Sequence, residues 1–271
     1  MTTQVMTVRT SFWRRLGVLW VLGLVGVIGV LPALLGQLSV LLTSNPAVAG
    51  IPLPVLAATA LIQPLLVMTV SVAVGVALAH HLGLRSYVVE QVEGVGRIGP
   101  ALRRDLPLAL GVALFIALMI VGLDAAFAPW MPKAVDAVGA ERSLGLTVTG
   151  VLYGGIVEEL MLRWGLMTLF AWLLWRVFQR GEGRPSGLLM ATAIILAAVV
   201  FSLGHLPAAA TIFGSLTPMV IVRTVLLNSV AGLALGWLYW QRSLETAMLA
   251  HGASHILMTL VSLAAVALRG A

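Results

Sequence analysis

Seven apolar stretches, each long enough to cross a lipid bilayer, occupy most of the chain. They cover approximately residues 16–42, 53–82, 106–127, 144–178, 187–206, 219–240 and 246–268. A spanning helix takes about 20 apolar residues, and a helix is required because its backbone groups bond to one another where water is absent. Only 10% of the 271 residues are charged, against about 25% in an ordinary soluble domain. The sequence therefore predicts an all-α fold, a polytopic integral membrane helical bundle formed as a single membrane domain over residues 1–271.

Two segments leave details of this bundle open. Pro207 is expected to end the fifth span, which would place His205 at a span end. The uncharged stretch 207–218 is then either a short broken helix or a re-entrant segment, so the count is seven or eight transmembrane helices. The polar stretch 85–105 is expected to be a loop, with room for an interfacial helix, because it runs from Arg85 to Asp105 and also holds Glu90, Glu93, Arg97, Arg103 and Arg104.

The basic residues indicate the orientation of the chain. Lys and Arg concentrate before the first span, between the second and third, and after the fourth. The positive-inside rule then predicts a multi-pass protein of the cell membrane with a cytoplasmic N-terminus. The first apolar run is much longer than the roughly 7–15 residues of a signal-peptide core, which favours an uncleaved span over a signal cleaved after Ala47-Val48-Ala49.

Composition also excludes several classes of function. The net charge of +6 is scattered over span ends and forms no basic stripe, so no nucleic-acid partner is expected. The chain has no cysteine, which excludes a disulfide, a thiol nucleophile and a Cys-ligated metal.

An acidic pair inside the fourth span is the leading candidate for a functional site. Glu158 and Glu159 are followed by Arg163 in an otherwise apolar segment, and an acid at the centre of a span costs roughly 2.5–3.5 kcal/mol. At about 100° per residue, Glu159 and Arg163 share one helix face in the favoured order for an ion pair. Glu158 faces away from Arg163, so it is available for acid–base chemistry. The alternative is that both acids pair with cations on other helices.

Three histidines in later spans supply a second element. His205 follows Phe201 by four residues, and His255 follows His251 by four, so each pair shares a helix face. A single membrane histidine is commonly a helix–helix hydrogen bond, but three in the same half as a Glu pair favour a site. His80 and His81 lie at a helix end beside a basic loop and are expected to be interfacial bystanders.

These motifs resemble a known family of membrane proteases. Glu158-Glu159-x-x-x-Arg163, Phe201-x-x-x-His205 and His251-x-x-x-His255, each in its own span and in this order, are similar to the CAAX prenyl protease and bacteriocin-processing (CPBP, or Abi) family, which includes the type II CAAX endopeptidase. The similarity covers residues 150–260 and extends to Gly232-x-x-x-Gly236, Tyr239 and Ser243-Leu244-Glu245. Residues 1–140 carry no motif, and 141–271 are expected to form the catalytic core.

The resemblance implies a glutamate-dependent intramembrane endopeptidase that acts on a membrane-associated peptide or protein without a cofactor or metal. It implies that Glu158 activates water with help from His205, that Glu159 and Arg163 are a supporting pair, and that His251 stabilises the oxyanion. His255 stands where the family usually has Asn. That difference keeps a hydrogen-bond donor but leaves the role of position 255 open.

Other chemistries remain as alternatives. His251-x-x-x-His255 has zinc-ligand spacing, although no His-Glu-x-x-His motif is present. Gly252-Ala253-Ser254 resembles the Gly-x-Ser of rhomboid-type serine proteases but leaves the Glu pair unexplained, and the Gly-x-Gly-Asp of aspartyl intramembrane proteases is absent. A non-catalytic scaffold or a proton- or ion-coupled transporter could also use a Glu/His cluster. Gly232 and Gly236 are predicted to make a close helix–helix contact.

Overall fold

Every element of the structure is helical in the part of the chain that is described. The computed structural model describes residues 11–45, 48, 50–132 and 144–270. The elements in chain order are α1 (Phe12–Ser44), α2 (Leu53–Leu82), α3 (Tyr87–Val92), α4 (Ile98–Phe127), η1 (Ala128–Trp130), α5 (Leu144–Thr149), η3 (Gly150–Glu158), η4 (Leu160–Met167), α6 (Thr168–Phe178), α7 (Gly187–Gly204), α8 (Leu206–Phe213), α9 (Pro218–Gln241) and α10 (Leu244–Gly270).

Seven candidate membrane spans lie within these described residues, each long and apolar enough to cross a bilayer. Apolar side chains remain exposed along most of them, including Val21, Leu118 and Leu260, as expected for a lipid-facing surface. The predicted all-α polytopic bundle is confirmed.

The fourth span is a single continuous helix made of α5, η3, η4 and α6. Its middle, at Gly150–Glu158 and Leu160–Met167, is wound as a π-helix. π-Winding bonds residue i to i+5, occurs mostly as single-turn bulges, and is frequent at functional sites. The value of about 100° per residue used to place Glu159 and Arg163 is that of a regular α-helix, and the structure departs from it at the residues that surround the Glu pair.

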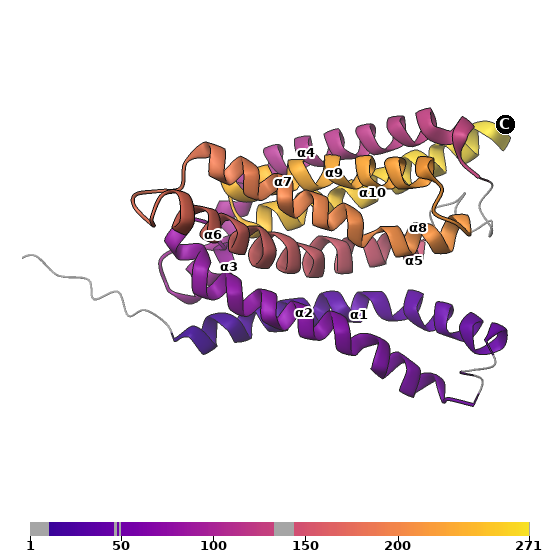
Figure 1. The fold of residues 1–271 in the computed structure, drawn as a ribbon, viewed down its shortest axis with the longest axis horizontal. Coiled ribbons are helices and arrows are strands. Elements are labelled where there is room, and N and C mark those ends of the chain that lie inside the picture. Colours follow the sequence, from indigo (N-terminus) through magenta and orange to yellow (C-terminus); the bar gives the residue numbers. More distant parts are fainter. Residues whose placement is uncertain (1–10, 46–47, 49, 133–143, 271) are drawn as a thin grey trace, which may run out of the picture.

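Glycines bring the first two helices close to this central helix. In Figure 1, α1 and α2 run side by side along one edge of the bundle. A Cβ atom at Gly26 would lie 2.6 Å from a Val157 side-chain atom, and one at Gly75 would lie 2.2 Å from the Trp164 indole. Both spacings are shorter than a carbon–carbon contact allows, so only glycine permits these helices to approach as they do.

The predicted contact at Gly232 and Gly236 is also present. It joins α9 to α7, where Cβ atoms at these positions would lie 2.8 Å from Ala198 and 2.9 Å from Ile194. The close approach lets the carbonyl oxygen of Gly232 reach the buried Arg163 side chain, with an Nη2–O distance of 3.4 Å. Helix packing at this seam thus contributes to the position of a site residue.

The third span begins earlier than predicted. Helix α4 starts at Ile98, so Arg103, Arg104 and Asp105 are helical and do not form a loop. Asp105 is buried and accepts hydrogen bonds from the Tyr87 hydroxyl at 2.5 Å and from Thr246 at 3.2 Å. These partners lie on α3 and α10. The hydrogen bonds to Asp105 therefore depend on contacts between helices, which the local sequence does not reveal.

The helix of the fifth span ends just before Pro207, as predicted, because α7 stops at Gly204 with His205 as its C-cap. Pro207 lies in the first turn of α8, where its missing N–H removes no helical hydrogen bond. His205 therefore lies at the end of α7, and the stretch 207–218 begins as the short helix α8, the first of the two alternatives left open. Together α7 and α8 form an apolar candidate span of 27 residues, Gly187–Phe213.

The junction between α10 and α3 is held by a buried carboxylate. Glu245 accepts hydrogen bonds from the Ser86 hydroxyl at 2.5 Å and from the backbone N–H groups of Tyr87 and Val88 at 2.7 and 3.1 Å. These N–H groups belong to the first turn of α3, where a carboxylate satisfies unpaired donors and complements the helix dipole. This contact fixes α3 against the end of the bundle.

Candidate active site

The predicted ion pair between Glu159 and Arg163 is present and fully enclosed. The two side chains are 0% and 2% exposed, and Nη1 of Arg163 lies 3.0 Å from Oε1 of Glu159. The guanidinium also lies 5.1 Å from the ring centre of Phe201, a cation–π contact from α7. A buried charge is tolerated only when it is paired in this way. Through Glu159 and Phe201, Arg163 links the central helix to α7.

Glu159 has a second partner that the local spacing did not predict. Nδ1 of His251, from α10, lies 2.7 Å from the same Oε1 atom. The bond requires Nδ1 to carry a proton, since a carboxylate only accepts. It fixes the ring so that Nε2 points away from Glu159, and Nε2 lies 4.0 Å from Oε2 of Glu158. Glu159 thus orients His251 toward the neighbouring glutamate.

Glu158 is the less constrained of the two acids. Its side chain is 18% exposed, whereas that of Glu159 is fully buried. Among the residues that the structure describes, only His251 brings a basic nitrogen within 4.0 Å of the Glu158 carboxylate. The expectation that Glu158 has no arginine or lysine partner therefore agrees with the geometry, and its carboxylate is available to a reacting group.

Glycines on the central helix make room for the two histidines of α10. The rings of His251 and His255 stack with centres 5.2 Å apart. A Cβ atom at Gly150 would lie 2.4 Å from Nδ1 of His255, and one at Gly154 would lie 3.2 Å from its Nε2 and 3.3 Å from Nε2 of His251. The sequence reasoning missed these two glycines, although their four-residue spacing, like that of Gly232 and Gly236, was a signal for them.

His205 joins the cluster through Phe201. Its Nδ1 lies 2.9 Å from the Phe201 carbonyl oxygen, and its ring packs edge-on against the Phe201 ring at 4.5 Å. The Phe201 ring also lies edge-on to the His251 ring, with centres 6.4 Å apart. The predicted pairing of Phe201 and His205 on one face is present, but no direct hydrogen bond or ion pair links His205 to Glu158 in the described structure.

The arrangement does not form a ready metal site among the described residues, where no three His, Asp or Glu side chains are grouped as metal ligands. Nδ1 of His251 is already engaged with Glu159. This bond leaves Nε2 of His251 as the nitrogen that could ligate a metal, so it does not by itself exclude zinc binding with His255.

Fold and site together define a multi-spanning membrane protein with a buried carboxylate–imidazole cluster formed by its central, fifth and last spans. Residues 140–257 match the family model described as type II CAAX prenyl endopeptidase Rce1-like. Over these residues the chain is similar to this family of membrane CAAX proteases, in agreement with the motif resemblance. No curated protein and no solved structure matches the chain significantly.

Proposed function

We propose that the protein is an intramembrane endopeptidase that hydrolyses a peptide bond of a membrane-associated peptide or protein, with Glu158 activating the water. The observation that carries this proposal is the pairing of an accessible Glu158 carboxylate with an imidazole 4.0 Å away whose orientation is fixed by a second, buried glutamate. Amide hydrolysis needs a general base that activates water and a hydrogen-bond donor that stabilises the oxyanion. Glu158 and His251 lie close enough together to supply these two groups.

The chemistry follows from these positions. Glu158 removes a proton from water as the oxygen attacks the carbonyl carbon, and later delivers that proton to the departing amine. His251 stabilises the oxyanion when Nε2 carries a proton, and the Glu159 carboxylate on Nδ1 stabilises the resulting imidazolium. Arg163 pairs with Glu159 and holds its carboxylate in place. We assign His205 to positioning the water, with its Nδ1 directed to the Phe201 carbonyl.

The cluster's shape supports a reaction site over the proton or ion relay of a transporter. His205, His251 and Arg163 all contact one ring, Phe201, and His251 also adjoins both glutamates. A relay is expected to string ionisable groups along a path across the membrane. In this protein, His205, His251 and Arg163 instead gather around the Phe201 ring.

A cleavage assay tests the proposal. Purified protein in bicelles is incubated in water enriched in oxygen-18 with peptides tethered to the bilayer, and the products are identified by mass spectrometry. Hydrolysis predicts two fragments, with one oxygen-18 atom in the new carboxyl group of the N-terminal fragment. A protein that releases no fragment from any tethered peptide, yet moves protons or ions across liposome membranes, would contradict the assignment.

Substitution of His255 by Asn separates a metal-free site from a zinc site. With no metal, prolonged chelation leaves activity unchanged, and His255→Asn retains turnover within about tenfold, because Asn can also donate to an oxyanion, a donor worth about 2.7–4 kcal/mol. A zinc site predicts the reverse, since Asn is a poor zinc ligand. Zinc content and activity are measured in the same samples. Activity lost on chelation and restored by zinc would contradict water activation by Glu158 alone, although the same residues would still form the site.

A further inference from the structure

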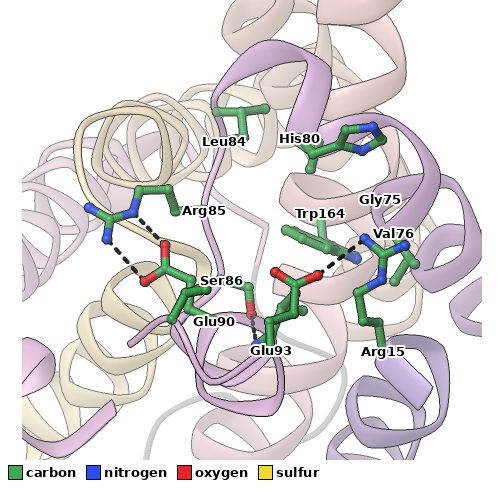
Figure 2. Close-up of a pocket in the computed structure, with 13 residues that line it drawn as sticks. Arg15, Gly75, Val76, His80, Leu84, Arg85, Ser86, Glu90, Glu93 and Trp164 are labelled. Carbon is green, nitrogen blue, oxygen red and sulfur yellow. Dashed lines mark hydrogen bonds and ion pairs between the residues drawn. The ribbon is translucent and has the colours of Figure 1, made fainter. Parts of the chain in front are cut away.

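A pocket separate from the Glu/His cluster lies at the end of the bundle where α1 begins and α2 ends. It has a volume of about 440 Å³ and is shown in Figure 2. None of the residues that line it belongs to the Glu/His cluster. Its wall is formed by the N-terminal turn of α1, the last turns of α2, the α2–α3 connection, α3 and its C-terminal loop, and one residue of the central helix, Trp164.

The charges in the wall are balanced but are not equally well paired. Arg85 holds Glu90 through two hydrogen bonds, of 2.6 and 3.0 Å, and this pair is complete in itself. Arg15 faces Glu93 at 3.6 Å, beyond a normal hydrogen bond, and both side chains are partly exposed. Two arginines and two glutamates give the wall no net charge. Of the two pairs, the Arg15–Glu93 pair is the one that can open to a ligand.

Two buried N–H donors in the same wall have no acceptor among the described residues. They are Nε1 of Trp164 and Nε of Arg15. Trp164 is only 3% exposed, and in Figure 2 its indole nitrogen lies on the side where Arg15 and Glu93 meet. Gly75 maintains this position, because a Cβ atom there would lie 2.3 Å from Nε1. Buried donors normally have partners, so their convergence on one pocket points to an acceptor supplied by a ligand.

We propose that this pocket binds the headgroup of a zwitterionic phospholipid, with its phosphate on Arg15 and Trp164 and its ammonium group on Glu93. A phosphate oxygen accepts from both orphan donors, and arginine is well suited to phosphate. The neutral wall matches a neutral headgroup and disfavours a net anionic one. Val76 and Ala79 on α2 supply an apolar wall toward the membrane-spanning part of the bundle.

Lipid binding to the full-length protein tests this assignment. The detergent-solubilised protein is titrated, with native mass spectrometry as readout, against phosphatidylethanolamine, phosphatidylglycerol and diacylglycerol of identical acyl chains, and against soluble phosphoethanolamine. Phosphatidylethanolamine is expected to bind at least about tenfold more tightly than each of the others. Equal retention of diacylglycerol would show an apolar groove only, and equal binding of phosphoethanolamine would show a soluble-ligand site; either result overturns the proposal.

Matched variants locate the lipid within the fold. Trp164→Phe removes the indole donor but keeps an aromatic ring, and Arg15→Gln removes the guanidinium; each is expected to weaken phosphatidylethanolamine binding about tenfold. The controls are Trp13→Phe and Arg14→Gln, which make the same changes at exposed positions outside the pocket. Size-exclusion and thermal unfolding confirm that each variant is folded. Pocket variants that bind like their controls would refute the site, whatever the outcome of the peptidase assay.

Discussion

Glu158→Gln is expected to reduce peptide cleavage by at least about 10³-fold while the protein stays folded. Gln preserves the shape of the side chain but cannot take a proton from water, and general base catalysis contributes about 10²–10⁴-fold. The Glu158 side chain is 18% exposed and engages no arginine among the described residues, so its replacement strands no buried charge. The measurements are turnover of a tethered peptide at saturating concentration and the melting temperature of the purified protein.

Glu159→Gln provides the matched comparison on the adjacent residue. Glu159 is fully buried and contacts both Arg163 and His251, so its neutralisation leaves the guanidinium without its counter-ion. This variant is expected to lose both activity and thermal stability, whereas Glu158→Gln loses activity alone. Full turnover by Glu158→Gln would refute water activation by this residue, and equal destabilisation of the two variants would show that both glutamates are structural.

Local spacing was sufficient to predict several of the contacts. Residues four apart on a helix are neighbours whatever surrounds them, so the Glu159–Arg163 and Phe201–His205 pairs follow from sequence alone. Small residues at the same spacing likewise predicted the α7–α9 contact at Gly232 and Gly236. The seven apolar runs were readable because the bilayer imposes a minimum helix length.

Contacts between helices were not readable in the same way. The bond from His251 to Glu159 joins residues 92 positions apart, and it depends on how α10 packs against the central helix. The π-winding around the Glu pair leaves no mark in the apolar pattern. Pro207 predicted the end of α7, but not that α8 would begin at once, because a proline that follows one helix is equally compatible with the first turn of the next.

The pocket beside Trp164 was missed for a related reason. Arg85, Glu90 and Glu93 were predicted to lie in a loop with room for an interfacial helix, which α3 supplies, and His80 was predicted to be a bystander at a helix end. His80 does lie in the last turn of α2, but it also lines the pocket beside Trp164. Charged residues in a connecting segment read as solvent-facing unless the helices that enclose them are known.

Arg163→Met is expected to destabilise the protein by about 3–5 kcal/mol, the cost of breaking a buried ion pair by removing one partner. Met retains much of the apolar stem, so the loss reports mainly on the missing charge. Arg163 is 2% exposed and lies against Glu159, the Gly232 carbonyl and the Phe201 ring. Its removal leaves Glu159 with His251 as its single charged or hydrogen-bonding partner in the described structure. Thermal unfolding in a fixed detergent measures the effect.

Arg223→Met is a close control for that experiment. Arg223 also pairs with a carboxylate, Asp124, at an Nε–Oδ1 distance of 2.7 Å, and lies 5.3 Å from the Phe213 ring, but the Asp124 side chain is 51% exposed. An exposed pair of this kind contributes about 0–1 kcal/mol. Adding Glu159→Gln to Arg163→Met should recover stability, because no uncompensated charge then remains. If Arg163→Met instead keeps its melting temperature and loses turnover, Arg163 contacts the substrate directly and its role is catalytic.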